Sequence, residues 1–354
     1  MRQTILLLRE RAAKHPAIGI LPLDSKMPGD LPNHVSAGPA RSPVIDFMRA
    51  VAIILVVFGH AQRGLFQTGQ ASGIYWDMIY PVVDYFIYVF HIPVFFATSG
   101  LLLDRHSEQS PRQFATRVGR LALLYLLWNT INAVPAVFFL RFINRSFGRA
   151  GYLDAINPAH VNGIMWFFVA LMFAHTFYFV TQRHALVRWL AIGLCVVALA
   201  IDADFHGAAY GSLWLLIGAE VSRLKLLDGR HFSRPQAGLS LLAYVIASAL
   251  SYAMGIPYYL AIPACAFGLF ALYSFGQTQV AQASFLTFVG TNTLSIYVMH
   301  VLAVAGLRIA FISFLQVRPS AVLIVLLTFV GVAIPLMAVT LFRRLRISKL
   351  LLLD

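Results

Sequence analysis

Charge is scarce in this chain of 354 residues, because only 12% of them are Asp, Glu, Lys or Arg, against roughly 25% in an average soluble domain. Hydrophobic residues make up 59%, and long apolar runs recur from residue 44 onward. A soluble all-α protein of this length is a poor alternative, since so few charges cannot cover so much apolar surface. We therefore expect an all-α, polytopic integral membrane protein.

Cysteine and acidic residues are also few. Cys195 and Cys265 both fall in apolar spans, which indicates small core residues and not a disulfide or a metal pair. The 14 acidic residues leave a net charge of +13, but the positive charge lies between the apolar spans, so nucleic acid is not expected as a partner. The chain lacks HExxH, a Walker A motif, a Rossmann glycine pattern and closely spaced His/Asp clusters, and no metal is predicted.

Hydropathy predicts about ten transmembrane helices within a domain over residues 44–342. Residues 1–43 contain six prolines and predict a flexible cytoplasmic tail without a signal peptide. Residues 343–354 predict a short basic cytoplasmic tail. The expected spans are 44–62, 80–103, 119–141, 164–181, 187–203, 209–223, 238–254, 258–276, 289–312 and 320–342.

Most of the 27 Lys and Arg residues fall in the segments that share a side with the N-terminus. Because cytoplasmic loops carry the excess of positive charge, this distribution predicts that both termini are cytoplasmic. The exceptions are Arg49, inside a span, and six on the opposite side: Arg63, Arg141, Arg145, Arg149, Arg308 and Arg318.

Ionisable residues inside the first span are the strongest functional signal, since such residues in a bilayer usually face a cavity or a partner. Arg49 and His60 are eleven residues apart, which places them on one helical stripe about three turns and roughly 16 Å apart. Asp46 lies three residues before Arg49 and can pair with it. The alternative is an interfacial Asp–Arg pair with a histidine at the far end of the helix.

The second and ninth spans each carry a polar stripe with spacing i, i+4, i+7. In the second it is Asp84, Tyr88 and His91, followed by Pro93, which should kink the helix, and by the small residues near Gly100 that permit close helix approach. The alternative is a kinked packing helix with a satisfied histidine. In the ninth span the stripe is formed by Thr293, Tyr297 and His300.

Arg117 and Arg120 share a face at the entry to the third span and could hold a phosphate-bearing ligand. The alternative is the positive-inside signal alone. Two other features are interpreted as structural. Residues 166–168, Trp-Phe-Phe, suggest an aromatic belt, and Glu220 with Arg223 suggests an interfacial pair.

From Pro43 to the tenth span, the chain resembles the acyltransferase-3 family of bacterial membrane proteins that O-acylate sugars and other acceptors. Its compact length and His91-Ile92-Pro93 resemble the fucose 4-O-acetylase-like branch, which includes the nodulation acetyltransferases of lipochitooligosaccharides. Unlike in many family members, no C-terminal esterase-like domain is expected. Four ordered segments carry the resemblance: Arg49-x10-His60, Phe90 to Gly100, Arg117-x-x-Arg120 and Ser295 to His300.

The resemblance implies a bacterial inner-membrane O-acetyltransferase that uses acetyl-CoA and a glycan or glycolipid acceptor. His60 is then the first candidate for the base or the acyl carrier. Arg49 would bind donor phosphates or orient the site, with Asp46 fixing its rotamer. The remaining roles are these: Arg117 and Arg120 contact acyl-CoA phosphates, while Asp84, His91, Ser99, Tyr297 and His300 line the acceptor side or supply oxyanion donors.

Two other classes fit buried ionisable residues. A secondary transporter is one, although no internal repeat is evident. A non-catalytic assembly or flippase subunit is the other, and it predicts that Arg49 and His60 can each be replaced without loss of function.

Overall fold

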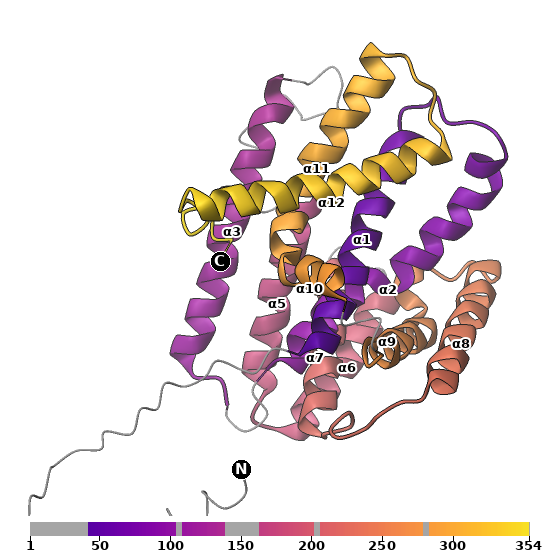
Figure 1. Ribbon diagram of the computed structural model, residues 1–354. Coiled ribbons are helices and arrows are strands. Elements are labelled where there is room, and N and C mark those ends of the chain that lie inside the picture. Colours follow the sequence, from indigo (N-terminus) through magenta and orange to yellow (C-terminus); the bar gives the residue numbers. More distant parts are fainter. Residues whose placement is uncertain (1–41, 104–107, 139–162, 202–205, 279–282, 354) are drawn as a thin grey trace, which may run out of the picture. The chain divides into compact units, whose positions relative to one another are not determined.

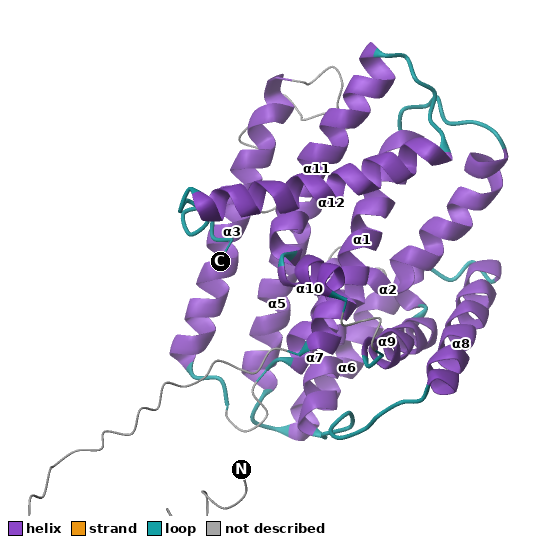
Figure 2. Cartoon of the chain, viewed as in Figure 1, coloured by secondary structure: helices purple, strands orange, loops and turns teal. Residues whose placement is uncertain are grey.

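The computed structural model describes residues 42–103, 108–138, 163–201, 206–278 and 283–353, and the regular elements in these ranges are helical (Figures 1 and 2). Each of the expected spans overlaps at least one helix, although the boundaries differ by several residues in places. The longer helices are α1 (Pro43–Phe66), α2 (Tyr80–Leu101), α3 (Pro111–Phe138), α5 (Trp166–Thr181), α6 (Ala185–Ala200), α7 (His206–Arg223), α8 (Arg234–Ala253), α9 (Ile262–Gly276), α11 (Thr293–Ile309) and α12 (Ala321–Arg344). The short elements are η1 (Tyr75–Ile79), η2 (Gly163–Met165), η3 (Tyr258–Leu260), α10 (Ser284–Thr291) and η5 (Ala310–Phe314).

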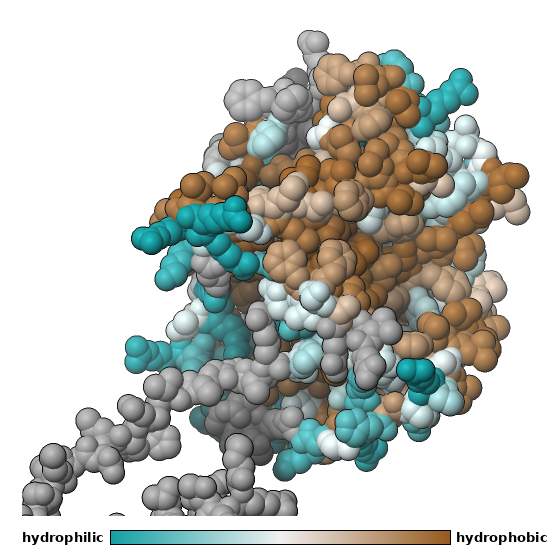
Figure 3. Space-filling model, viewed as in Figure 1, coloured by the Kyte–Doolittle hydropathy of each residue, from teal (hydrophilic) through white to brown (hydrophobic). Residues whose placement is uncertain are grey.

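Six helical stretches of the described chain are long and apolar enough to cross a membrane: Pro43–Phe66, Tyr75–Leu101, Gly163–Thr181, Arg234–Ala253, Thr293–Phe314 and Ala321–Arg344. Two shorter apolar helices are α6 and α9. Large apolar side chains face outward on α8 and α12, and Figure 3 shows an apolar surface over α12 on the face viewed, with polar side chains toward the lower edge. A polytopic membrane fold explains this surface, while the number of about ten spans and their orientation stay predictions.

The sequence predicts a tail at each end of the chain, and the structure describes most of the C-terminal one. Of the expected N-terminal tail, residues 1–43, residues 1–41 lie outside the described part of the chain, and Pro43 is the first residue of α1. At the other end, the indole Nε1 of Trp128 in α3 donates a hydrogen bond to the carbonyl oxygen of Leu351 at 3.1 Å, and Leu353 is buried. The segment after α12 therefore packs on α3.

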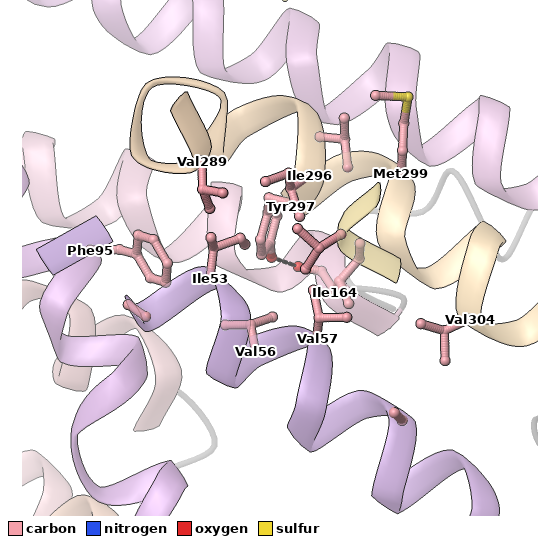
Figure 4. Packing of buried hydrophobic residues seen from close by; sticks show 14 of the residues in the cluster. Ile53, Val56, Val57, Phe95, Ile164, Val289, Ile296, Tyr297, Met299 and Val304 are labelled. Atoms are coloured by element: carbon pink, nitrogen blue, oxygen red, sulfur yellow. Dashed lines mark hydrogen bonds between the residues drawn. The ribbon is translucent and has the colours of Figure 1, made fainter. Parts of the chain in front are cut away.

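Helix α1 is in contact with several other helices, namely α2, α9, α10, α11 and α12. Pro43 suits its first turn because proline supplies a helical φ where no N–H is needed. Ile53 and Val57 on α1 are fully buried, and Figure 4 shows them facing Ile296 and Tyr297 of α11. The helix with the Arg49–His60 stripe is thus at the centre of the packing.

Helices α2 and α7 approach each other closely through glycine. A Cβ atom added to Gly100 would lie 2.1 Å from the carbonyl oxygen of Leu215, and one added to Gly218 would lie 2.2 Å from that of Ala97. This confirms the expectation that small residues near Gly100 permit close helix approach. Pro93 lies within α2, and the kink expected from it stays a prediction.

The expected span 289–312 is wrong at its start. Instead of one helix, α10 ends at Thr291 and α11 begins at Thr293. Asn292 separates them, and its side-chain Nδ2 donates to the carbonyl oxygen of Phe288 at 2.8 Å. Asn side chains compete with the helix for backbone groups, which favours a break here. Gly290, beside the break, permits contact with the Asp46 backbone of α1.

Glu220 in α7 is paired, as the sequence suggests, but with two arginines. Arg188 of α6 donates its Nε hydrogen to Glu220, and both side chains are buried. The expected partner, Arg223, lies 3.9 Å away. Arg188 also donates to the carbonyl oxygen of Gln182 at 2.7 Å, so this cluster joins α6 and α7 to the end of α5.

Candidate functional site

A cavity of about 320 Å³ opens between the helices and collects residues from six of them: α1, α2, α3, α5, α10 and α11. Six residues singled out from the sequence line it, namely Arg49, Ser99, Arg117, Arg120, Thr293 and Tyr297. The sequence places these residues on separate spans, and the fold brings them to one space. Its other lining residues are Phe95, Leu121, Leu124, Phe167, Phe168, Leu171, Gly290, Thr291 and Leu294.

Three guanidinium groups give the cavity its chemical character. Arg117 and Arg120 lie one turn apart on α3, and Arg49 enters from α1. The Nε of Arg49 donates to the Thr98 hydroxyl at 3.3 Å, which ties this side chain to α2. Guanidinium groups bind phosphate oxygens through two parallel hydrogen bonds, so converging arginines suit a phosphate-bearing ligand.

Asp46 lies one turn before Arg49 and is buried. Its carboxylate is an acidic group in the first turn of α1, where negative charge is stabilised by the helix N-terminus. That it fixes the rotamer of Arg49 stays a prediction, as does its role in catalysis.

Most of the remaining cavity wall is apolar and aromatic, with hydroxyl groups from Ser99, Thr291 and Thr293 among it. Phe167 and Phe168 of α5 line it, and Phe168 is 2% exposed. The expectation that residues 166–168 form an aromatic belt at the membrane interface is therefore wrong for these two side chains, because the turn of α5 directs them inward. A cavity with cationic residues and a long apolar wall suits a ligand with an anionic head and a flexible arm.

Tyr297 connects the cavity to the histidines. It lines the cavity, and its ring packs on Phe167 and Phe168 with centroids 5.1 and 5.6 Å away. Its hydroxyl donates to the carbonyl oxygen of Ile164 in η2, as the dashed line in Figure 4 shows. One turn along α11, the His300 ring lies 6.1 Å from the Tyr297 ring.

His60 and His300 lie in contact, although 240 residues separate them in the sequence. Their ring centroids are 5.2 Å apart with the planes tilted by 52°. His300 is fully buried, and its Nδ1 lies 2.7 Å from the carbonyl oxygen of Tyr297. The polar stripe of the first span therefore meets that of the ninth span through these two rings. Residue spacing within one span cannot predict such a contact between spans.

The second-span stripe meets α1 beyond His60. Arg63 donates from Nε and Nη2 to the two carboxylate oxygens of Asp84, at 2.7 and 2.6 Å, and its guanidinium lies 3.3 Å from the Tyr88 ring centroid. The ring of His91 stands edge-on to Tyr88 with centroids 4.6 Å apart. Asp84 is therefore held by a cation that the sequence interpretation missed.

Two signals for this pair were present in the sequence. Arg63 lies three residues after His60, so it continues the same helical stripe past the expected end at residue 62. Asp84 needs a partner inside the membrane domain. Gln62 and Tyr75 complete the arrangement, since Gln62 Nε2 donates to Asp84 and the Tyr75 hydroxyl donates to Gln62, each at 3.3 Å.

Comparison with protein-family models gives one described as an acyltransferase domain, acyltransferase-3, which matches residues 43–339. The match covers most of the chain, and the chain therefore belongs to the acyltransferase-3 family of membrane acyltransferases. The family expectation is confirmed at this level, while the fucose 4-O-acetylase-like branch stays a prediction. Neither curated proteins nor solved structures give a match.

Proposed function

We propose that this acyltransferase moves an acetyl group from acetyl-CoA to a hydroxyl of a sugar in a glycan or glycolipid, a fucose-like residue being the first candidate. The observation that carries the proposal is the cavity in which Arg49, Arg117 and Arg120 face an apolar wall that leads to Tyr297. Family membership supplies the reaction class, and the cavity supplies a reason for the donor.

Acetyl-CoA has the two chemical parts that the cavity suits. Its nucleotide end carries phosphate groups, which Arg117 and Arg120 would bind with Arg49. Its pantetheine arm is long, flexible and uncharged, and it would lie along Phe95, Phe167 and Phe168. This arrangement directs the thioester toward Tyr297 and the histidines.

His60 is the proposed base of the reaction. Arg49 and His60 lie on one stripe of α1, about three turns apart, so the helix holds the donor-binding end and the reacting end at a fixed separation. The neutral imidazole takes the proton of the acceptor hydroxyl while the oxygen attacks the thioester carbonyl carbon. The carbon–sulfur bond then breaks, and the proton passes from His60 to the departing thiolate.

The acceptor would reach His60 from the end of α1 where Arg63, Asp84 and Tyr88 meet. Asp84, His91 and His300 are proposed for the acceptor side, and Ser99 and Tyr297 are proposed to face the acceptor from the donor cavity that they line. With the arginine end facing the cytoplasm of a bacterial inner membrane, CoA would enter from the side where it is made.

The test uses purified protein in lipid nanodiscs with radiolabelled acetyl-CoA and a set of fucosyl glycosides and glycolipids. We expect a product heavier by one acetyl group and the release of one CoA for each product molecule. A second arm measures sealed vesicles with a labelled glycoside and no CoA. Uptake in that arm without acetyl transfer in the first would favour a transporter and overturn the proposal.

A further inference from the structure

The ring of His300 has its two nitrogens in different environments. Nδ1 lies 3.1 Å from the carbonyl oxygen of Ile296 and 2.7 Å from that of Tyr297. A carbonyl oxygen only accepts hydrogen bonds, so Nδ1 must carry the proton. In a neutral imidazole the other nitrogen, Nε2, then holds a lone pair and can only accept.

This Nε2 atom is buried and has no hydrogen-bond partner within the described part of the chain. A buried polar atom without a partner costs free energy, and such an atom in a functional protein calls for an explanation. The ring of His60 is in contact with His300, and it carries an N–H group in its neutral form. The two rings form no hydrogen bond as they stand, but a turn of the His60 ring that points its N–H at the Nε2 of His300 would supply the donor that this atom needs.

We propose that His300 is a positioning residue for His60, an inference that rests on the proposed function. In the reacting state the His60 ring turns its N–H toward the Nε2 of His300, which accepts it and so fixes which of the two His60 nitrogens is free. The free nitrogen faces the acceptor and serves as the base. Because His300 is anchored to the α11 backbone through Nδ1, it can hold the His60 ring in one orientation.

The proton movements balance in this scheme. The acceptor O–H bond breaks and its proton goes to the free nitrogen of His60, while a new carbon–oxygen bond forms at the thioester carbonyl. His60 is now an imidazolium whose second N–H remains shared with the Nε2 of His300. The carbon–sulfur bond breaks, the thiolate takes the proton from the free-side nitrogen, and His60 returns to its neutral form. His300 keeps its own proton on Nδ1 throughout.

The alternative role for His300 is to donate a hydrogen bond to an oxyanion, and the hydrogen bonds around it argue against that role. The Tyr297 hydroxyl donates to the carbonyl oxygen of Ile164. His91 lies with Nδ1 2.5 Å from the carbonyl oxygen of Ile87, so its ring also presents an acceptor at Nε2. A neutral His300 in this tautomer has no free proton to offer an oxyanion, and its free lone pair fits an accepting role.

Two substitutions separate an accepting role from a packing role. His300→Leu keeps the bulk and removes the acceptor, whereas His300→Gln carries an amide oxygen that reaches the position of Nε2. We expect His300→Leu to lower kcat by about a hundredfold with the KM for acetyl-CoA within twofold of wild type, and His300→Gln to retain kcat within about tenfold. The pH profile of kcat/KM should move in His300→Leu and stay in place in His300→Gln.

Val304→Ala provides the matched control for packing, because Val304 is buried one turn further along α11. It should lower thermal stability and leave kcat unchanged. Equal kcat in His300→Leu and His300→Gln, whether both are active or both inactive, would overturn the proposal. Absence of acetyl transfer in the wild type with every acceptor would instead count against the proposed function.

A measurement without turnover tests the contact itself. Solid-state ¹⁵N NMR of protein labelled at histidine should show a coupling between two ring nitrogens across an N–H···N hydrogen bond. This coupling should be lost in both His60→Ala and His300→Leu and remain in His231→Ala, where the exposed loop histidine is removed. A wild-type spectrum without the coupling overturns the proposal, whether or not the transfer assay succeeds.

Discussion

Arg49 and Arg63 lie on the same helix, fourteen residues apart, yet the fold uses them differently. Arg63 gives two hydrogen bonds to the Asp84 carboxylate and stacks on Tyr88. Arg49 donates to the neutral hydroxyl of Thr98 and lines a cavity that Arg117 also enters. A guanidinium satisfied by a carboxylate and a ring ties α1 to α2. Guanidiniums that converge on a cavity direct positive charge toward a ligand. The presence of an arginine in a membrane-spanning helix therefore does not tell whether it joins two helices, as Arg63 does, or lines a cavity, as Arg49 does.

The largest expected effect is a loss of activity on substitution of His60, which lies between Arg49 and Arg63 on α1. His60→Ala should lower kcat by about a thousandfold, because it removes the proposed base. The affinity for CoA should stay within twofold, since no cavity-lining arginine is touched. Initial rates and equilibrium binding, measured on one preparation, check both parts. His231→Ala serves as the control, and full activity in His60→Ala would contradict the assigned role.

Arg63 and Asp84 should contribute mainly to stability. Asp84→Asn leaves the guanidinium without its carboxylate, and we expect the free energy of unfolding to fall by about 2 kcal/mol. Unfolding in mixed micelles with increasing sodium dodecyl sulfate measures this change. The double variant Arg63→Met with Asp84→Leu should recover part of the loss, because no charge is left unpaired. A double variant less stable than Asp84→Asn would show that the hydrogen bonds and the ring contact of Arg63 stabilise the fold beyond mutual charge neutralisation.

The cavity arginines should affect binding more than stability. Arg117→Gln should weaken CoA binding by about tenfold, which corresponds to one lost charge-assisted contact with a phosphate. The effect should shrink at high salt, as electrostatic contacts do. Arg112→Gln is the matched control, because Arg112 is exposed in the first turn of the same helix and does not line the cavity. Equal affinities for the two variants would remove Arg117 from the donor site.

The smallest effect is expected for an arginine paired at the surface. Arg183 lies 3.2 Å from Glu108, but the side chains are 73% and 55% exposed. Solvent screens such pairs, so Arg183→Ala should change the free energy of unfolding by less than about 0.5 kcal/mol. The same detergent titration measures it. A fall in the free energy of unfolding as large as that of Asp84→Asn would mean that solvent exposure does not predict how much an ion pair stabilises this protein.

Much of the fold could be predicted because hydropathy marks apolar helices directly. The expected spans each overlap a helix, and the stripes Arg49–His60, Asp84–His91 and Thr293–His300 follow from 3.6-residue periodicity. The break at Asn292 was missed because the polar stretch Thr291-Asn292-Thr293 is short, and hydropathy averaged over a whole span stays apolar across it.

The candidate site was predicted only in part, because periodicity describes one helix at a time. It could not tell that His60 meets His300, that Arg49 shares a cavity with Arg117, or that Asp84 is taken up by Arg63. These pairings depend on how the helices pack. Phe167 and Phe168 were misassigned for the same reason, since an aromatic residue near a helix end can face either lipid or the interior.

The central claim is that α1 divides donor binding and chemistry between Arg49 and His60. Calorimetric titration of CoA into wild type, Arg49→Gln and His60→Ala, all in the same nanodiscs, tests it most directly. We expect Arg49→Gln to bind CoA about tenfold more weakly than wild type, and His60→Ala to bind it as wild type does. Wild-type affinity in Arg49→Gln, or a loss of affinity in His60→Ala, would contradict that division.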